Sequence, residues 1–462
     1  MITPAAPSTE APAISRGPIG RLRALRIWDA AGVRDFRLLW ASEGVSVLGD
    51  QFHAVALSWL VITLTGSGLA LGTVLIAISV PRALLLMPMG VVADRRSPRS
   101  LMLSSHLARA AIVAAIAVLA ASGNASIPAL AALGVLFGCA DAVFLPAMEA
   151  FVPRSVGPDR LASANSLLQA TLQLASVAGP PVAGVVVAAA GTGIAFGIDA
   201  ASFVIAAGIV ALIGGAAVSA TAVSRGDGAR VEPAAGSAQP GTAAVADPGT
   251  DSFLTSLRGG LRYVLADPGI AVMLAVSLVL NFALNGPAAV GMPWLAELRY
   301  HAGAAGLGLL AAGFGVGSLA GTLIAGNARL ERQGRILLVG IAVAGLAMAG
   351  VGLADSLAVA FLLFAVAGLC IGYVNIVALS WLQARVEVRM LGRVMSVVML
   401  VSFGVSPLSM AVAGALIDAN ATMLFVGAGA LVVLATGAAL LLGTVELFDG
   451  PRPAPADGRA SG

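Results

Sequence analysis

Five ionisable side chains lie inside long apolar stretches of the sequence, where a charge is costly to hold. They are Asp50, Arg82, Arg109, Asp141 and Asp199. Burying such a group in hydrocarbon costs at least about 2.5 kcal/mol, so each is a candidate functional residue. A carboxylate at mid-depth can take up a proton on one side of a membrane and release it on the other, and Asp50 and Asp141 are the two candidates for this proton coupling. The alternative is structural: Arg82 or Arg109 neutralises the acid and joins two helices.

The depths of these residues suggest different roles. Asp50 lies about 21 Å into its apolar stretch, counted at 1.5 Å per residue, and Asp141 precedes the end of its own stretch by nine residues. Arg109 is expected to be structural because it lies about 12 Å from one end. Asp199 is predicted to be shallow, near the other end of its stretch, and structural as well. The second half of the chain has only neutral polar groups at comparable depth, namely Asn281, Asn285, Tyr373 and Asn375.

Membrane-spanning helices must position these residues. The chain is 59% hydrophobic and only 11% charged, whereas a soluble domain has about 25% charged residues. A spanning helix needs about 20 mostly apolar residues, which predicts an all-α fold with twelve spans. The six in the first half are 36–64, 68–92, 101–121, 127–150, 165–190 and 193–216, and the six in the second half are 269–296, 304–327, 335–354, 357–384, 393–418 and 422–444.

The segments outside the spans complete the domain organisation. We expect an N-terminal tail at 1–35, a first half at 36–216, a linker at 217–268, a second half at 269–444 and a C-terminal tail at 445–462. The linker is rich in Ala, Gly, Ser and Pro, as flexible linkers are. Its last part, "FLTSLRGGLRYVLADP", predicts a short helix that lies on the membrane surface.

The arginines predict the orientation. All 26 basic residues are arginines, and 23 of them lie in the tails, the linker and the loops that face the same side. Positively charged loops stay in the cytoplasm. Both termini are therefore expected to be cytoplasmic, in a multi-pass protein of the cytoplasmic (inner) membrane.

The two halves carry traces of a duplication. "GVVADRRSPR" at 90–99 aligns with "GNARLERQGR" at 326–335, and "LASANS" at 161–166 aligns with "LGRVMS" at 391–396. The two offsets, 236 and 230 residues, nearly agree. Two parallel six-span halves around a central site are typical of secondary transporters, in which one half rocks against the other.

The loop after the second predicted span carries a family motif. The pattern Gly-x-x-x-Asp-Arg-x-Gly-x-Arg-Arg is represented by Gly90, Asp94, Arg95 and Arg99, with serine at the second glycine and last arginine positions. Arg96 lies at an unspecified position of the pattern and belongs to the same candidate gate. On this motif and the twelve spans, the sequence resembles the major facilitator superfamily. The stretches "FLPAMEAFVPRSVGPDRLASANSL", "IDAASF" and "LGRVMS" resemble the branch with enterobactin-type siderophore and macrolide exporters.

The resemblance implies a central cavity lined by spans one, four, seven and ten. It places Asp50 and Asp141 on one side, with Arg82 as a further candidate to contact substrate. The opposite side would be lined by Asn281, Asn285, Tyr373 and Asn375.

The resemblance also implies that the motif loop is a cytoplasmic gate. Asp94 would meet the N-terminal end of a helix in the other half and stabilise the outward-facing state. The second copy of the loop has Leu330 at this position, so the gate is expected to be one-sided.

Glycines and a proline mark two further spans. Gly179, Pro180 and Gly184 in "AGPPVAG" resemble the motif of the superfamily's antiporters, most of which are exporters. The fourth span has Gly134 where many proton-coupled members carry an arginine, so their coupling mechanism does not transfer directly. In the eighth span, Gly313, Gly317 and Gly321 fall on one helical face, which predicts close helix packing there.

These observations favour an exporter of a small organic molecule, such as a drug, a siderophore or another secreted metabolite, driven by inward proton movement. The alternative is a nutrient or metabolite uptake permease on the same fold. Neither a His-Glu-x-x-His nor a Gly-x-Ser-x-Gly motif occurs, so we expect no enzyme activity. We further expect no bound cofactor or metal, no nucleic-acid partner, and a functional monomer in the bilayer.

Overall fold

The computed structural model describes residues 28–214, 253–326 and 334–441. Every regular element in these ranges is a helix, as a hydrocarbon environment requires, because a helix satisfies its own backbone hydrogen bonds. Eleven helices of this described part are long and apolar enough to cross a membrane. Most of the predicted N-terminal tail, the predicted C-terminal tail and most of the predicted linker lie outside the described residues.

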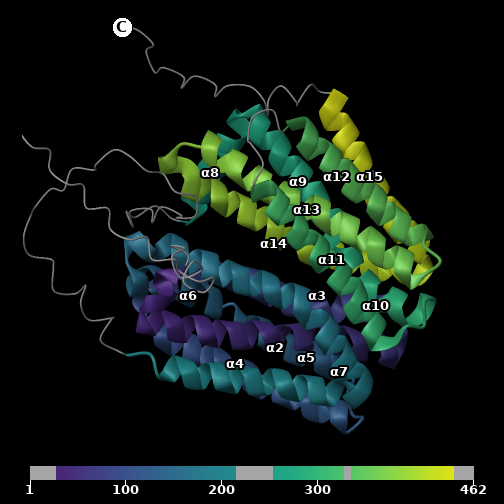
Figure 1. The fold of residues 1–462 in the computed structure, drawn as a ribbon, viewed down its shortest axis with the longest axis horizontal. Helices are drawn as coiled ribbons and strands as arrows, with labels where there is room; N and C mark the ends of the chain where they lie inside the picture. The colour runs from purple at the N-terminus through teal and green to yellow at the C-terminus, as the bar shows by residue number, and fades with distance from the viewer. Residues whose placement is uncertain (1–27, 215–252, 327–333, 442–462) are drawn as a thin grey trace, which may run out of the picture.

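The first half of the chain forms one bundle, drawn in purple to teal (Figure 1). Its helices are α2 (Arg34–Thr65), α3 (Gly68–Arg95), α4 (Pro98–Ala121), α5 (Ile127–Asp141), α6 (Phe144–Val156) and α7 (Leu161–Ala211). Short 3-10 turns precede α2 at Ala30–Gly32 and α7 at Pro158–Arg160.

Helix α7 contains two spans. Its 51 residues would make a straight helix of about 77 Å, well over twice the roughly 30 Å hydrocarbon core. The chain turns at Gly191, whose φ of 84° and ψ of 167° are not helical and suit glycine because it has no Cβ. The eleven long helices therefore provide twelve spans. The predicted break between residues 190 and 193 is confirmed.

The second half forms the other bundle, drawn in green to yellow (Figure 1). After α8 (Phe253–Ala266) come α9 (Pro268–Gly286), α10 (Met292–Trp294), α11 (Gly303–Gly326), α12 (Gly334–Leu353), α13 (Leu357–Arg385), α14 (Val388–Ala419) and α15 (Ala421–Leu441). Two π-helical turns, Pro287–Gly291 and Leu295–Arg299, extend α9 and α10 into one span. The helix predicted before this span is present as α8, which packs against α14.

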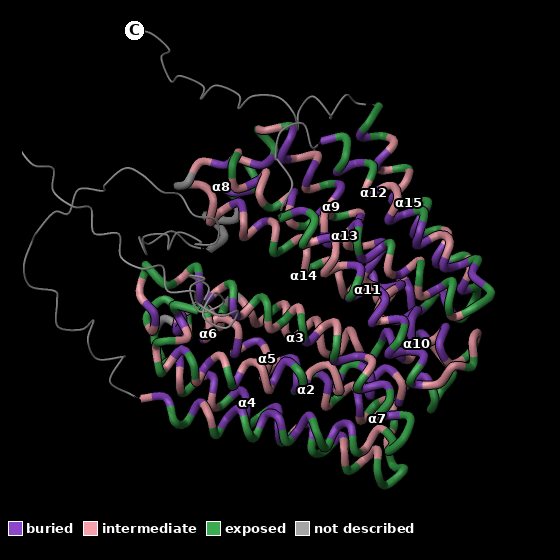
Figure 2. Tube along the Cα trace, in the orientation of Figure 1, coloured by how far each residue is buried: buried purple, intermediate pink, exposed green. Residues whose placement is uncertain are grey.

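The pattern of buried and exposed residues is that of a protein surrounded by lipid. Buried positions lie where helices face one another within each bundle, and exposed positions run along the outer surfaces (Figure 2). Large apolar side chains are among the most exposed residues, including Leu84 and Leu434 at 71% and Leu174 at 63%. Such apolar surfaces are favourable in contact with lipid and unfavourable in contact with water. The predicted glycine face of α11 is confirmed, since Gly313, Gly317 and Gly321 pack against α13.

The two halves meet mainly along two helix pairs, α7 with α11 and α3 with α14. Both contacts bring glycines against backbone. A Cβ at Gly184 would lie 2.6 Å from the carbonyl oxygen of Ala304, and one at Gly72 would lie 2.8 Å from that of Met410. Both contacts lie toward the end of the molecule that the arginine distribution predicts to be external.

The halves are separate at the opposite end. A hollow of about 270 Å³ lies there between α3 and α6 on one side and α14 on the other. Gly90 lines this hollow and has no atom within 4 Å of where its Cβ would stand. The bundles accordingly diverge toward α6 and α8 in Figure 1. With the predicted orientation, this is an inward-facing arrangement.

Candidate functional site

The intramembrane charges of the first half gather around one cavity. It measures about 490 Å³, and every residue that lines it belongs to the first half. Its lining includes three of the predicted site residues, Asp50, Arg82 and Asp141, and also Arg109. Helices α2, α3, α4 and α5 each contribute at least one of its charged groups.

Asp141 is held by two guanidinium groups. Arg82 Nη1 lies 3.0 Å from Asp141 Oδ2, and Arg109 Nη1 lies 3.1 Å from Asp141 Oδ1. The Arg109 side chain is 3% exposed and that of Asp141 13%, so this pair is shielded from water. The charges of the three groups sum to +1, and they join α3, α4 and α5.

The span that carries Asp141 breaks directly after it. Asp141 is the last residue of α5, and α6 begins only at Phe144. Pro146 follows within the first turn of α6 and cannot donate a backbone hydrogen bond to Ala142. Ser105 Oγ of α4 donates a 2.8 Å hydrogen bond to the carbonyl oxygen of Ala140 at this break. The backbone stays close to helical here, with φ −58° and ψ −21° at Ala142 and φ −79° and ψ −30° at Val143, so the hydrogen-bond pattern is interrupted without unwinding the span.

Arg109 is fixed by aromatic rings as well as by charge. Its guanidinium carbon lies 4.4 Å from the centre of the Phe203 ring and 4.8 Å from that of Phe144. Its Nη2 is 3.1 Å from His106 Nδ1. Cation–π contacts gain strength away from water. This environment suits the structural role expected for Arg109, although the residue also lines the cavity.

Asp199 is fully buried within the first half. It follows Gly191 by eight residues, about 12 Å along the helix, and its predicted structural role fits its contact with α2. Its Oδ2 is 3.1 Å from Nδ1 of His53, one turn after Asp50 on α2. The ring of His53 stacks on Phe137 with their centres 4.7 Å apart. The pair joins α2 to the second part of α7.

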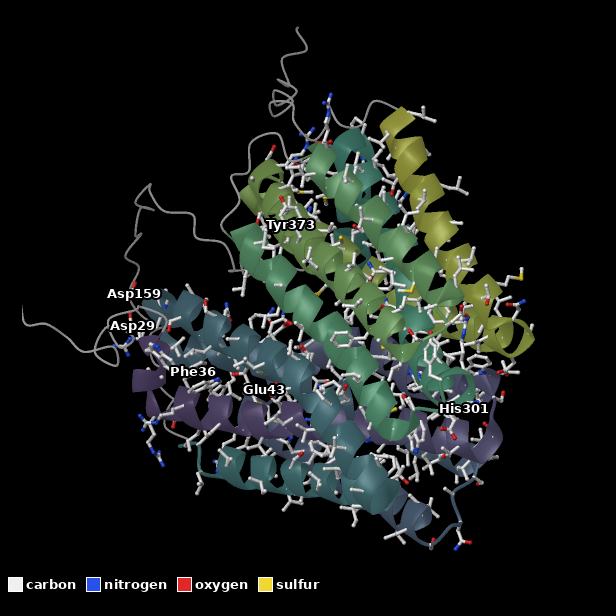
Figure 3. The ribbon with its side chains drawn as sticks, turned by 45° about the vertical axis from the view of Figure 1, so that its right-hand side comes forward. Asp29, Phe36, Glu43, Asp159, His301 and Tyr373 are labelled. Carbon is white, nitrogen blue, oxygen red and sulfur yellow. The ribbon has the colours of Figure 1, made fainter. Side chains whose placement is uncertain are left out.

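Glu43 is a cavity residue that the sequence analysis missed. It lies on α2, in the half of the molecule opposite Tyr373 (Figure 3). Its distance of seven residues from Asp50 is two helical turns, so both carboxylates lie on one face of α2, about 10 Å apart along the axis. This spacing of seven residues could have identified Glu43 from the sequence as a second acid beside Asp50. Glu43 was overlooked because it lies near the end of its apolar stretch.

The carboxylates of Glu43 and Asp50 differ from that of Asp141. Neither makes a hydrogen bond or an ion pair with another side chain in the described part. Glu43 Oε2 is buried without a hydrogen-bond partner, as are single atoms of four other side chains of this cluster: His53, His106, Arg109 and Asp199. These five are all of the unpaired buried side-chain atoms among the described residues. Buried polar groups are normally paired, and exceptions are frequent at functional sites.

The neutral residues predicted for the opposite side do not join this cavity. Asn281 Nδ2 donates a 2.8 Å hydrogen bond to the carbonyl oxygen of Ser277, and Asn285 Nδ2 donates to Asn281 Oδ1 at 3.3 Å. Both amides therefore bind along their own helix, α9. Tyr373 and Asn375 lie on α13, and neither lines the 490 Å³ cavity.

The motif loop is only partly described. Gly90 lines the hollow between the halves, and Arg95 and Arg96 are exposed. Arg99 donates hydrogen bonds to the carbonyl oxygens of Val210 at 3.3 Å and Ala211 at 2.5 Å. Arg99 thus binds the C-terminal end of α7 within its own half. The side chain of Asp94 and the residue Leu330 lie outside the described residues, so the one-sided gate stays a prediction.

The antiporter-like motif lies on two helix contacts. Gly179 faces Gln51 of α2, and Gly184 faces Ala304 and Gly308 of α11. A Cβ at Gly308 would in turn lie 2.5 Å from the carbonyl oxygen of Pro180. The motif therefore forms part of the contact between the two halves.

Comparisons with known proteins agree with this fold. Residues 39–410 match the model of the Major Facilitator Superfamily, and the chain belongs to this superfamily of transporters. It is a multi-pass membrane protein.

Three similar proteins illustrate the relationship. An uncharacterised transporter of this type, y4rN from Sinorhizobium fredii, is 29% identical over 88% of this chain and 94% of its own. The multidrug efflux pump Tap from Mycolicibacterium fortuitum is 26% identical over 87% of this chain and 92% of its own. A crystal structure of a bacterial homologue of the human lysosomal transporter Spinster, inward-facing and unoccupied, has a TM-score of 0.61 at 15% identity, covering 91% and 98% of the two chains.

Proposed function

We propose that the protein exports a small organic cation across the cytoplasmic membrane in exchange for protons. The observation that carries the proposal is the 490 Å³ cavity, in which Glu43 and Asp50 lack a basic partner while Asp141 has two. Export is supported by the efflux activity named for the relative Tap and by the antiporter-like residues Gly179, Pro180 and Gly184.

The charges around the cavity favour a cation. Arg82, Arg109 and Asp141 sum to +1, and ionised Glu43 and Asp50 bring the cluster to −1. This sum covers the acids and arginines that line the cavity, and Asp199 is not among the lining residues. A buried net charge is costly, so the site is best occupied by one positive charge. A proton and an organic monocation are alternative ways to supply it, and their competition is the basis of exchange.

The charges and the lining of the cavity also favour one class of substrate. Both arginines are engaged by Asp141, so they are poorly placed to recognise an anion. The cavity walls also contain Phe137, Phe144 and Met148, which suit an apolar body. Within the exporter branch that the sequence resembles, this favours a cationic drug or metabolite over an anionic siderophore.

Transport by everted membrane vesicles tests the proposal. With an inside-acid pH gradient, vesicles that contain the protein should accumulate a cationic probe such as ethidium or tetraphenylphosphonium, and a protonophore should abolish the accumulation. Glu43→Gln and Asp50→Asn should each lower the rate at least about tenfold, because each removes one exchangeable charge.

The control is Glu297→Gln, which removes a carboxylate at the predicted external end and should leave the rate unchanged. Absence of accumulation for a panel of cations, or wild-type rates in both cavity variants, would contradict the proposal. Accumulation by right-side-out vesicles instead would favour the uptake permease.

A further inference from the structure

A single carboxylate joins the two halves at the predicted external end. Asp418 lies in the last turn of α14, in the second half, beside the first residues of α3, in the first half. Its Oδ1 accepts a 2.6 Å hydrogen bond from the N–H of Gly68. Its Oδ2 accepts hydrogen bonds from Ser67 Oγ at 2.6 Å and from the N–H of Leu69 at 3.1 Å.

These bonds cap a helix from another part of the chain. The first N–H groups of a helix have no partner within it, and the N-terminal end attracts negative charge. Ser67 caps the N–H of Ala70 at 3.2 Å, and Asp418 takes the two N–H groups before it. Within the protein, the N–H groups of Gly68 and Leu69 therefore have a partner only while α14 lies against α3.

The surrounding backbone permits this approach. A Cβ at Gly68 would lie 3.3 Å from Asp418 Oδ1, and one at Gly414 would lie 2.7 Å from the carbonyl oxygen of Gly68. The same two helices, α3 and α14, border the hollow at the opposite end of the molecule. Their contact is thus closed at the end that Asp418 joins and open at the other.

The equivalent contact in the other helix pair has no such acid. The offset of 230 residues between "LASANS" and "LGRVMS" places Ala188 of α7 at the position of Asp418 in α14. The contact between α7 and α11 rests on backbone at Gly184 and Gly308. Among the described residues, the charged cap is therefore found in the α3–α14 contact and not in the α7–α11 contact, the two largest contacts between the halves.

We propose that Asp418 is an external latch, which holds the outer end of the transporter closed by capping α3 and must release this helix before the cavity can open outward. The latch acts in the conformational cycle, whatever the substrate and the coupling ion are.

Distance measurements between spin labels test the latch. We would place labels at Asn124→Cys, in the first half, and Met423→Cys, in the second, since both residues are exposed at the latch end, in a chain with Cys139→Ala and Cys370→Ala. Asp418→Ala should raise the ratio of long-distance to short-distance populations about tenfold, the size expected for loss of a charged helix cap, and Asp418→Asn should raise it by a smaller factor.

The two variants separate capping from packing. Asparagine has the shape of aspartate and keeps one carbonyl oxygen that can accept, but it loses the charge and the second acceptor oxygen. A cap therefore predicts that Asp418→Asn shifts the populations part of the way toward Asp418→Ala, whereas packing alone predicts wild-type populations for Asp418→Asn. Ser67→Ala should shift them less, because both backbone bonds to Asp418 remain.

The control is Asp355→Asn, since Asp355 is an exposed acid at the same end that pairs with Arg299 within its own half. Populations that stay at the wild-type ratio in both Asp418 variants would overturn the latch, as would an equal shift in the Asp355 control. Because the readout is conformational, a failure of cation transport would leave this result interpretable.

Discussion

Asp141 shows how far a residue's surroundings decide its role. The sequence made Asp50 and Asp141 equal candidates for proton coupling. In the structure Asp141 contacts two arginines and Asp50 contacts none among the described residues. Removing one member of a shielded ion pair leaves an uncompensated charge. We therefore interpret Asp141 as the residue that holds Arg82 and Arg109 in place, and Asp50 with Glu43 as the exchangeable acids.

Asp267 offers a residue-scale prediction outside the spans. Its Oδ2 lies 2.8 Å from Arg385 Nε, and its Oδ1 caps α9 by accepting from Gly269 N and Ile270 N. Burial tends to raise the pKa of Asp267, but the hydrogen bonds from Arg385, Ile270 and Gly269 outweigh it and hold the pKa below the ordinary 3.8. The ionised form is thus the one that the folded state favours.

We expect Asp267→Asn to destabilise the protein by about 2 kcal/mol at neutral pH. Since the folded pKa is lowered, this contribution is complete above pH 3.8 and is lost as the pH falls through the folded value. Thermal unfolding in detergent at several pH values measures it. Asp355→Asn, whose side chain is 98% exposed, is the control. A variant effect that stays constant into strong acid would contradict the assignment.

Other residue contacts were beyond sequence reasoning for a physical reason. His53 and Asp199 are 146 positions apart, and Asp418 meets α3 from a distance of about 350 positions. Residues on different helices meet only through packing, which a single sequence does not encode locally. From the sequence alone, Asp418 is an ordinary polar residue at the end of a span, and only the structure shows that α3 lies beside it.

At the scale of elements, most helices and turns could be predicted from the local sequence. The length of apolar runs predicted the spans and the turn between 190 and 193, and glycine spacing predicted the packing face of α11. The break after Asp141 was missed because the apolar run continues through it. Pro146 was the available signal, since proline removes the hydrogen bond that would join α5 to α6.

The helix pair α7 and α11 gives a prediction at this scale. Gly184→Ala would place a methyl group 2.6 Å from a carbonyl oxygen of α11, and backbone cannot move aside as a side chain can. We expect a loss of about 1–3 kcal/mol in stability and slower transport, measured by thermal unfolding and by vesicle assay.

Gly197→Ala is the matched control on the same helix. A Cβ at Gly197 would meet nothing within 4 Å, and alanine is the better helix former. This variant should keep wild-type stability or exceed it. Equal behaviour of the two alanine variants would show that the close contact of the halves at Gly184 is unimportant.

At the scale of the whole molecule, the two halves divide the work. The charged groups around the cavity belong to the first half, and the second half supplies the surface against which the first half packs at one end. The contacts at α7 with α11 and α3 with α14 close one end and leave the other apart. Alternating access requires such a pair of ends that close in turn. In this arrangement, Asp418 acts at one end, and the predicted gate residue Asp94 lies toward the other.

The central claim is that one cavity exchanges a proton for an organic cation, and proton release upon binding tests it most directly. Purified protein in weakly buffered detergent solution would be titrated with tetraphenylphosphonium at neutral pH while the pH is recorded. The account predicts release of about one proton per cation bound, with neither binding nor release in the Glu43→Gln, Asp50→Asn double variant. Binding of the cation without proton release would contradict it.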